Sequence, residues 1–242
     1  MGAIDRLVLW NLDLTLVDVG RVSRAAYADA FRRVTGRPLV SLPQLAGRTD
    51  SEIFFEALAL NDIPAAGSDT ADAELHARYF WELEAAFGLR QDELASSGNL
   101  LPGARQAVEA AAAMPGVIQT VLTGSIRPNA IAKLRAFGLA EFFDLELGGY
   151  GSDAYPRGSL VLMSRTLATE RFGAVSTVYI ADTRRDVDAA RVGGAASIAV
   201  ATGRETAAEL REAFADIVLQ DLSDTPEVTA AIDRLTRVPA GR

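Results

Sequence analysis

Polar residues that can carry chemistry occur in four short groups along this chain of 242 residues. The groups are Asn11-Leu12-Asp13-Leu14-Thr15, then Thr123-Gly124, then Arg157, and finally Asp182 with Asp186. Carboxylates can transfer protons or bind hard metal ions, and hydroxyl and guanidinium groups can bind anions. What the groups do together depends on whether the fold brings them to one place.

Each group lies at or soon after the end of a short apolar segment that has the character of a buried strand. The expected strands are 7–10, 117–122, 142–147, 175–180, 197–201 and 217–219. Helical spacing predicts helices over 22–34, 102–114, 128–137, 160–171, 186–192, 206–214 and 226–235. This alternation predicts an α/β fold with a doubly wound, mostly parallel sheet. Ligands bind such sheets at the carboxyl ends of the strands, where the four groups would meet.

A helical segment interrupts this alternation after the first strand. Residues 42–87 have helical patterning, with breaks at 61–64 and at Gly67-Ser68, and they contain no strand-like run. Residues 88–99 are polar and are expected to form a return linker. The sequence therefore predicts an α/β core of residues 1–16 and 99–242, with a small all-helical domain of residues 17–98 inserted into it.

Composition excludes several classes of function. The net charge of −8 predicts that the protein repels nucleic acid and anionic membranes, so neither is expected as a partner. The chain has no cysteine and only one histidine, His76, which excludes disulfides, cysteine-based zinc sites and metal sites with several histidines. No segment resembles a signal peptide or a membrane span, so a cytoplasmic protein is expected.

The order and positions of the four groups resemble the haloacid dehalogenase (HAD) superfamily, and the resemblance covers essentially the whole chain. The family pattern is a strand followed by Asp-x-Asp-x-Thr, a strand with Thr or Ser, a Lys or Arg, and a strand followed by Gly-Asp and a second Asp. The resemblance implies a Rossmann-like core with a helical cap after the first strand. It also implies a Mg²⁺-dependent phosphatase that hydrolyses a small phosphorylated metabolite through an aspartyl-phosphate.

The resemblance implies a role for each residue of the pattern. Asn11 occupies the position of the nucleophile, and Asp13 matches the general acid and base. The implied metal ligands are Asn11, Leu12 through its carbonyl, Asp182 and Asp186. The implied contacts to the phosphoryl group are Thr123, Gly124 and Arg157. Two roles are possible for Thr15, contact with the substrate or an ordinary hydrogen bond in the turn. Two are also possible for Arg48, which could bind a substrate anion or lie in solvent.

Position 11 departs from the family pattern, which requires Asp. An amide oxygen is a poor nucleophile, and loss of a catalytic nucleophile costs on the order of 10⁴–10⁶ in rate. Asn is close to Asp in size, its oxygen can bind Mg²⁺, and removing one negative charge eases the approach of a phosphate dianion. The chain as written is therefore expected to bind Mg²⁺ and a phosphorylated ligand with negligible turnover. It could be a trapped variant of an active enzyme or a natural pseudo-phosphatase.

Three other interpretations stay open. A phosphomutase on the same scaffold would also use Asp13. A haloacid dehalogenase would need neither metal nor phosphate contacts, so the set of Asp13, Asp182 and Asp186 disfavours it. A non-catalytic binding or regulatory protein is suggested by Asn11 alone. Lys133 lies in the middle of a predicted helix beyond the second group and is not expected to replace Arg157. The sequence identifies neither the substrate nor the oligomeric state.

Overall fold

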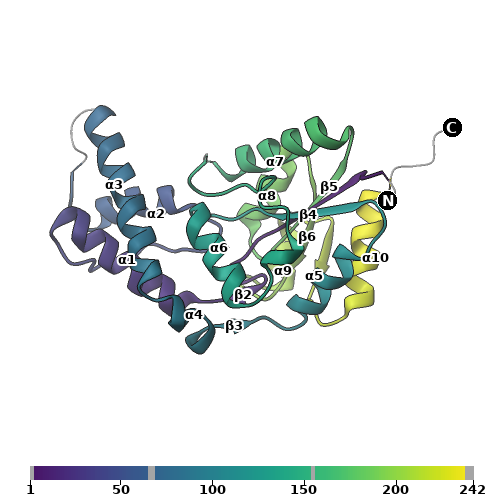
Figure 1. Ribbon diagram of the computed structural model, residues 1–242, viewed down its shortest axis with the longest axis horizontal. Coiled ribbons are helices and arrows are strands. Elements are labelled where there is room, and N and C mark those ends of the chain that lie inside the picture. The colour runs from purple at the N-terminus through teal and green to yellow at the C-terminus, as the bar shows by residue number, and fades with distance from the viewer. Residues whose placement is uncertain (1–2, 65–68, 154–155, 238–242) are drawn as a thin grey trace.

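The computed structural model describes residues 3–64, 69–153 and 156–237, and its centre is a five-stranded parallel sheet (Figure 1). The strand order is β4-β1-β5-β6-β7, and every pairing between neighbours is parallel. The strands are β1 Arg6–Trp10, β4 Val117–Val121, β5 Ser176–Ala181, β6 Ala196–Val200 and β7 Ile217–Leu219. The predicted fold class is confirmed.

Helices cover both faces of the sheet, which explains why the strands are almost continuously apolar. On β1, Leu7 and Leu9 belong to one buried cluster with side chains of α7 and α8, whereas Val8 and Trp10 belong to another with side chains of α5 and α10. The helices of this part of the chain are α5 Ala104–Ala112, α6 Arg127–Ala136, α7 Arg157–Phe172, α8 Arg184–Gly193, α9 Ala207–Glu212 and α10 Thr225–Thr236.

The strand predicted at 142–147 is wrong. This segment begins with a short 3₁₀ helix, Ala140–Phe142, and then runs irregularly along the edge of the sheet. Side chains of β4 bind its carbonyls, because Gln119 Nε2 donates to Phe142 O (3.0 Å) and Thr120 Oγ1 donates to Asp144 O (2.6 Å). Its backbone contacts with β4 are scattered, such as Asp144 N to Gln119 O (2.9 Å) and an isolated bridge between Leu122 and Gly149, so the segment forms no strand on this side of β4.

The segment between β1 and the rest of the sheet is helical, as predicted. It leaves and returns through a two-stranded antiparallel ribbon, β2 Val17–Asp18 and β3 Asn99–Leu100. Residues 19–98 between them, called the helical insertion below, lie mostly to the left of the sheet in Figure 1. Its helices are α1 Gly20–Thr35, α2 Asp50–Leu60, α3 Asp69–Gly88 and α4 Gln91–Ser97. The break expected at Gly67-Ser68 lies outside the described residues.

Two details of the insertion were predicted incorrectly. Residues 42–49 are not helical, because Pro43 and Gly47 interrupt the run and Gly47 has a positive φ of 69°. The supposed linker at 88–99 contains α4, whose first turn carries two acidic residues, as the helix dipole favours, and whose Leu94 is buried. Among the helices that the structure describes, none is long and apolar enough to cross a membrane.

Candidate functional site

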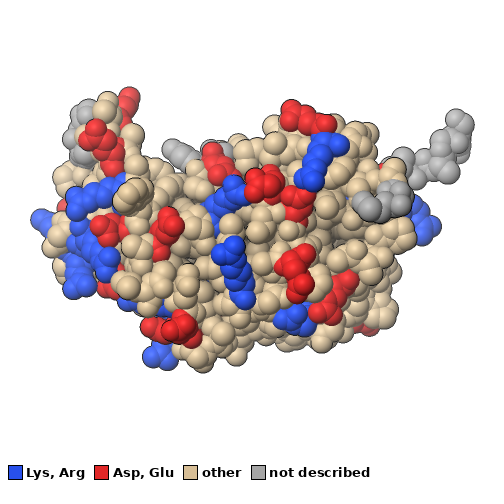
Figure 2. Space-filling view, in the orientation of Figure 1, with Lys and Arg blue, Asp and Glu red and all other residues tan. Residues whose placement is uncertain are grey.

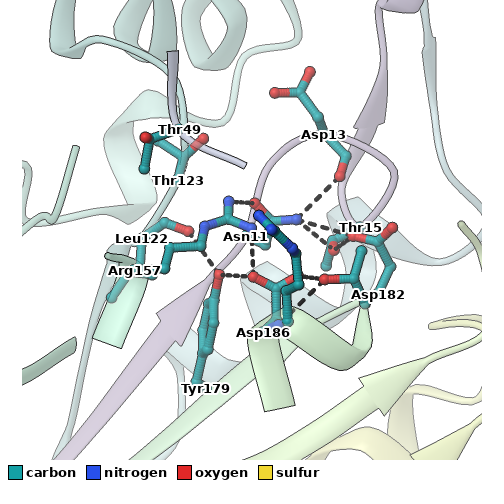
Figure 3. Close-up of polar contacts among 12 residues, drawn as sticks. Asn11, Asp13, Thr15, Thr49, Leu122, Thr123, Arg157, Tyr179, Asp182 and Asp186 are labelled. Atoms are coloured by element: carbon teal, nitrogen blue, oxygen red, sulfur yellow. Dashed lines mark hydrogen bonds and ion pairs between the residues drawn. The ribbon is translucent and has the colours of Figure 1, made fainter. Parts of the chain in front are cut away.

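The carboxyl ends of β4, β1 and β5 bring the predicted site residues together. These three strands are adjacent and parallel, so Thr123, Asn11 and Asp182 emerge at the same edge of the sheet. All three side chains are buried, and Figure 3 shows Asn11 at the centre of a network of polar contacts. Arg157 and Asp186 reach the same network from the first turns of α7 and α8.

The side-chain amide of Asn11 is held in one orientation. Its Nδ2 lies 2.9 Å from Asp182 Oδ1, 3.1 Å from the carbonyl oxygen of Asp13 and 3.3 Å from Thr15 Oγ1. Its Oδ1 accepts a hydrogen bond from Arg157 Nη2 at 3.0 Å. A guanidinium group can only donate, so turning the amide over would place an NH₂ group against another donor. The neighbours therefore direct the nitrogen of Asn11 toward Asp182.

Arg157 is anchored by Asp186. The two side chains form a buried ion pair, and the Asp186 carboxylate also accepts hydrogen bonds from Tyr179 (2.9 Å) and Thr183 (2.6 Å). Burial opposes the charge of Arg157, but the Asp186 carboxylate outweighs it and raises the pKa of Arg157 above its usual value. Asp186 thus accepts three hydrogen bonds and orients the guanidinium of Arg157 toward Asn11, and the metal-binding role that the resemblance implied for it stays a prediction.

Leu12 and Thr15 make their described contacts with other groups of the protein. The carbonyl of Leu12 accepts the backbone N–H groups of Thr15, Leu16 and Val17 at 3.2, 2.8 and 3.0 Å, so it closes the turn after β1 and is not free to bind a metal. The carbonyl near Asp182 is that of Asp13, one residue further along the chain. Thr15 is fully buried behind the cavity wall and donates to Asp182 Oδ1 at 3.0 Å.

Of the two residues predicted in the loop after β4, Gly124 lines the cavity and Thr123 lies behind its wall. Thr123 is buried, and its hydroxyl accepts a hydrogen bond from the backbone N–H of Ser125 at 3.2 Å. Gly124 and Ser125 line the adjacent cavity instead. A side chain at Gly124 would overlap the carbonyl oxygen of Arg48, so glycine lets this loop lie directly against the helical insertion. Thr123 thus shapes the loop, and the residues after it face the cavity.

Asp13 is held by a lysine that sequence reasoning had set aside. Its carboxylate points away from Asn11 in Figure 3 and lies 2.8 and 2.6 Å from Lys133 Nζ. Lys133 belongs to α6, is only 2% exposed, and reaches the site because α6 begins directly after the loop of Ser125. Lys133 does not take the place of Arg157 beside Asn11, but its contact with Asp13 was not predicted. The signal that could have identified it is composition, since Lys133 is the only lysine in the chain.

A cavity of about 660 Å³ connects this network with the helical insertion. That volume suits a small molecule. Of the residues predicted for the site, those lining the cavity are Asn11, Asp13, Arg48, Gly124 and Arg157. Those lying behind its wall are Leu12, Thr15, Thr123, Asp182 and Asp186. The insertion also contributes Arg21 and Arg24, which were not predicted, while Arg48 forms an ion pair with Glu56.

The oxygen atoms around Asn11 fit a hard divalent cation in part. Within residues 3–64, 69–153 and 156–237, no three His, Asp or Glu side chains gather as a metal site. However, Asp182 Oδ2 is buried without a hydrogen-bond partner, and burial together with the nearby Asp186 carboxylate raises the pKa of Asp182. Carboxylate and carbonyl oxygens, such as those of Asp182 and Asp13, are ligands that Mg²⁺ prefers. Position 11 directs a nitrogen toward them, so the fit requires an oxygen at that place.

Comparison with known proteins found matches over most of the chain. The model of the haloacid dehalogenase-like hydrolase family matches residues 8–191, and a second model, described as HAD-hydrolase-like, matches residues 159–225. The probable phosphatase IndB of Dickeya dadantii (strain 3937) is 28% identical over 247 residues, covering 96% of this chain and 97% of that protein.

Solved structures share the fold at low identity. A β-phosphoglucomutase from Clostridium difficile superposes with a TM-score of 0.68 at 16% identity, covering 96% of this chain and 98% of that one. A predicted phosphoglycolate phosphatase from Haemophilus somnus 129PT gives 0.61 at 18% identity, covering 93% and 98%. The first family model spans β1 to α8 and so includes all four polar groups. The chain belongs to the haloacid dehalogenase-like hydrolase family.

Proposed function

We propose that this chain has the scaffold of a Mg²⁺-dependent phosphatase for a small phosphorylated metabolite, with Asn11 in the place of the nucleophile. The observation that carries the proposal is the position of Asn11. Its oxygen faces the buried guanidinium of Arg157, next to Asp182, at the wall of a cavity sized for a small molecule. The name of the probable phosphatase IndB, a relative over almost the full length, supports the same reaction class.

With aspartate at position 11, each neighbour has a chemical task. The carboxylate would attack phosphorus and form an aspartyl-phosphate, which water then hydrolyses. Arg157 lies against the oxygen of residue 11, so it can offset charge on the phosphoryl oxygens. Asp13 lines the cavity and would protonate the leaving group and later take a proton from water. Mg²⁺ bound by residue 11, Asp182 and the Asp13 carbonyl would reduce repulsion between carboxylate and phosphate.

We further propose that residues 17–98 act as a cap on a core of residues 1–16 and 99–242. The first turn of α2 contacts the loop after β4: Asp50 N donates to Gly124 O (2.7 Å), and Ile126 N donates to Asp50 Oδ2 (2.8 Å). Such contacts would let the insertion close over bound substrate, exclude water and select the leaving group. The arginines of the insertion that line the cavity would favour an anionic ligand in a protein of net charge −8.

The test is the substitution Asn11→Asp, which restores a charged nucleophile and metal ligand. We expect Mg²⁺-dependent release of phosphate from 4-nitrophenyl phosphate, whereas the unchanged protein shows negligible release. Asn99→Asp, at an exposed position, is the matched control and should stay inactive. Mass spectrometry of the starting protein excludes deamidation of Asn11 as a source of activity.

A folded Asn11→Asp protein without activity on a broad panel of phosphate esters would contradict the phosphatase proposal. A binding or regulatory role would then explain the intact cavity better. Product analysis on sugar phosphates in the same experiment separates hydrolysis, which gives free phosphate, from mutase activity, which gives an isomeric sugar phosphate.

A further inference from the structure

Lys133 has an environment unlike that of any arginine on the protein surface. Its Nζ is surrounded by three oxygens, Asp13 Oδ1 at 2.8 Å, Asp13 Oδ2 at 2.6 Å and Ser125 Oγ at 2.8 Å. An ammonium group has three donors, so these contacts satisfy it completely. The centroid of the Phe87 ring, from the helical insertion, lies 5.4 Å from the same nitrogen, and this ring helps to exclude water from it. Burying an ammonium group is costly without such partners, so the contact with Asp13 is strongly favoured.

The same contacts fix Asp13 from behind. Both carboxylate oxygens lie against Lys133, and Ser125 Oγ lies 3.3 Å from Oδ2, yet the side chain of Asp13 remains 41% exposed where it lines the cavity. The carboxylate is therefore tied to α6 and to the loop after β4 on one side and open to a ligand on the other. Other charged groups near this pair are Asp50 of α2 and Arg157 of α7.

We propose that Lys133 is a positioning residue that holds the general acid and base Asp13 at the cavity wall, within reach of the leaving group. This inference rests on the proposed function for the role of Asp13, but the ion pair itself does not. Lys133 has no direct contact with Asn11 among the contacts that the structure describes, so it acts through Asp13 and Ser125. A compact ammonium fits three converging oxygens, whereas a planar guanidinium would not, so an arginine at this position could not make the same contacts.

The ion pair can be tested in the unchanged protein. Labelling with ¹⁵N-lysine gives a single side-chain signal, because the chain has only one lysine. We expect the Lys133 ammonium protons to exchange slowly with water, and to exchange at least about tenfold faster after Asp13→Asn, since a charge-assisted hydrogen bond is lost. Equal exchange rates in the two proteins would overturn the proposal without any reference to phosphatase activity.

The positioning role is tested by the leaving-group dependence of kcat/KM in the Asn11→Asp protein. An alkyl phosphate needs its leaving group protonated, whereas 4-nitrophenyl phosphate hardly does. Lys133→Met should lower kcat/KM for the alkyl ester by roughly 10²-fold and for the aryl ester only a few-fold, mainly through kcat, since a positioned acid contributes about 10²–10⁴. Arg135→Met, exposed on the same helix, is the matched control and should change neither value.

The absence of cysteine allows a chemical rescue. Lys133→Cys should show the same selective loss, and alkylation of its thiol with 2-bromoethylamine in denaturant, followed by refolding, forms a C–S bond, expels bromide and places an amine where the lysine was. Recovery of the alkyl-ester rate supports positioning by the ammonium. Equal losses for both esters, or no recovery after alkylation of a folded protein, would overturn it. An inactive Asn11→Asp protein with an intact, Asp13-dependent ammonium signal would instead contradict only the proposed function.

Discussion

At the scale of single residues, the contacts of Asn11 determine what the site can bind. The donor Arg157 and the acceptor Asp182 lie on opposite sides of its amide, so its oxygen and nitrogen cannot exchange places without loss. A cation near Asp182 would meet the nitrogen of this amide. An aspartate would present oxygens to both neighbours, and the substitution therefore changes metal binding as well as nucleophilicity.

The first prediction is that Asn11→Asp raises the affinity for Mg²⁺ by at least about tenfold, because a second charged oxygen ligand replaces an amide nitrogen. Isothermal titration of each purified protein with MgCl₂, without substrate, measures the difference. Adding Asp182→Asn to the Asn11→Asp protein should remove the gain. Equal Mg²⁺ affinity in the first two proteins would show that the orientation of Asn11 does not control the metal.

The second prediction concerns the buried pair of Arg157 and Asp186. Arg157→Ala leaves a buried carboxylate without its cation, which should lower the unfolding free energy by about 3–5 kcal/mol. Combining it with Asp186→Asn should recover part of that loss. Urea unfolding of the single and double variants measures the coupling. In the Asn11→Asp background Arg157→Ala should also reduce the rate by roughly 10²–10³. Additive effects on stability would mean that the two charges do not depend on each other.

The sequence was a better guide to which polar groups lie together than to the contacts that each of them makes. Asn11 and Asp182 meet because parallel strands end at one edge, which follows from apolar runs and their alternation with helices, whereas Arg157 reaches them from the first turn of α7. The partners of Asp13 and Asp186 depend on how α6 and α8 pack, and helical spacing contains no information about such long-range contacts. For this reason Lys133 was not predicted: its side chain reaches Asp13 from α6, and the spacing of residues along the sequence does not reveal such a contact.

At the scale of elements, side-chain caps explain where four of the described helices begin, namely α2, α8, α9 and α10. Thr49 caps α2 with a reciprocal pair of hydrogen bonds to Glu52, as Thr-x-x-Glu spacing predicts. In place of the strand predicted at 142–147, two carbonyls of this segment accept hydrogen bonds from side chains of the neighbouring strand β4, which is a tertiary contact that an apolar run does not reveal. The start of α2 also contacts the loop after β4, so the helical insertion and the sheet meet at a glycine, Gly124.

The third prediction follows from that close approach. Gly124→Ala adds a methyl group where the carbonyl of Arg48 lies, so the loop and the insertion must move apart. In the Asn11→Asp background we expect a higher KM and faster proteolytic cleavage within residues 19–98. Gly88→Ala is the matched control, because a side chain there meets no atom within 4 Å. Unchanged KM and cleavage for Gly124→Ala would show that this contact does not govern closure.

At the scale of the whole molecule, charge is unevenly distributed. The net charge is −8, yet Figure 2 shows basic side chains gathered over the helical insertion at its left end. Between insertion and sheet lies a buried acid, Asp50, which accepts hydrogen bonds from Tyr27 (2.6 Å) and from the backbone of Ile126 (2.8 Å). Burial raises the pKa of Asp50 from 3.8 to about 6, so the contact between the two parts of the molecule contains a group that titrates near neutral pH.

The fourth prediction is a pH dependence of stability from Asp50. Between about pH 4 and pH 6 the folded protein keeps a proton that the unfolded chain has released, so this residue's contribution falls as pH rises through that window. The full change is up to about 3 kcal/mol. Urea unfolding from pH 4 to 7.5 should show a smaller decline for Asp50→Asn than for the unchanged protein. Asp92→Asn, at an exposed site, should follow the unchanged protein, and parallel curves for all three would contradict the assignment.

The short ribbon of β2 and β3 has a consequence for how such a molecule can diversify. Because Val17 pairs with Leu100, the two ends of the helical insertion join the rest of the protein at neighbouring points. An inserted unit whose two ends are adjacent can be exchanged, shortened or lost while the strand order of the sheet stays the same. The residues at the strand ends could then remain while the insertion above them is replaced. Exchange of whole insertions at this ribbon would give one chemical centre access to new substrates in a single genetic step.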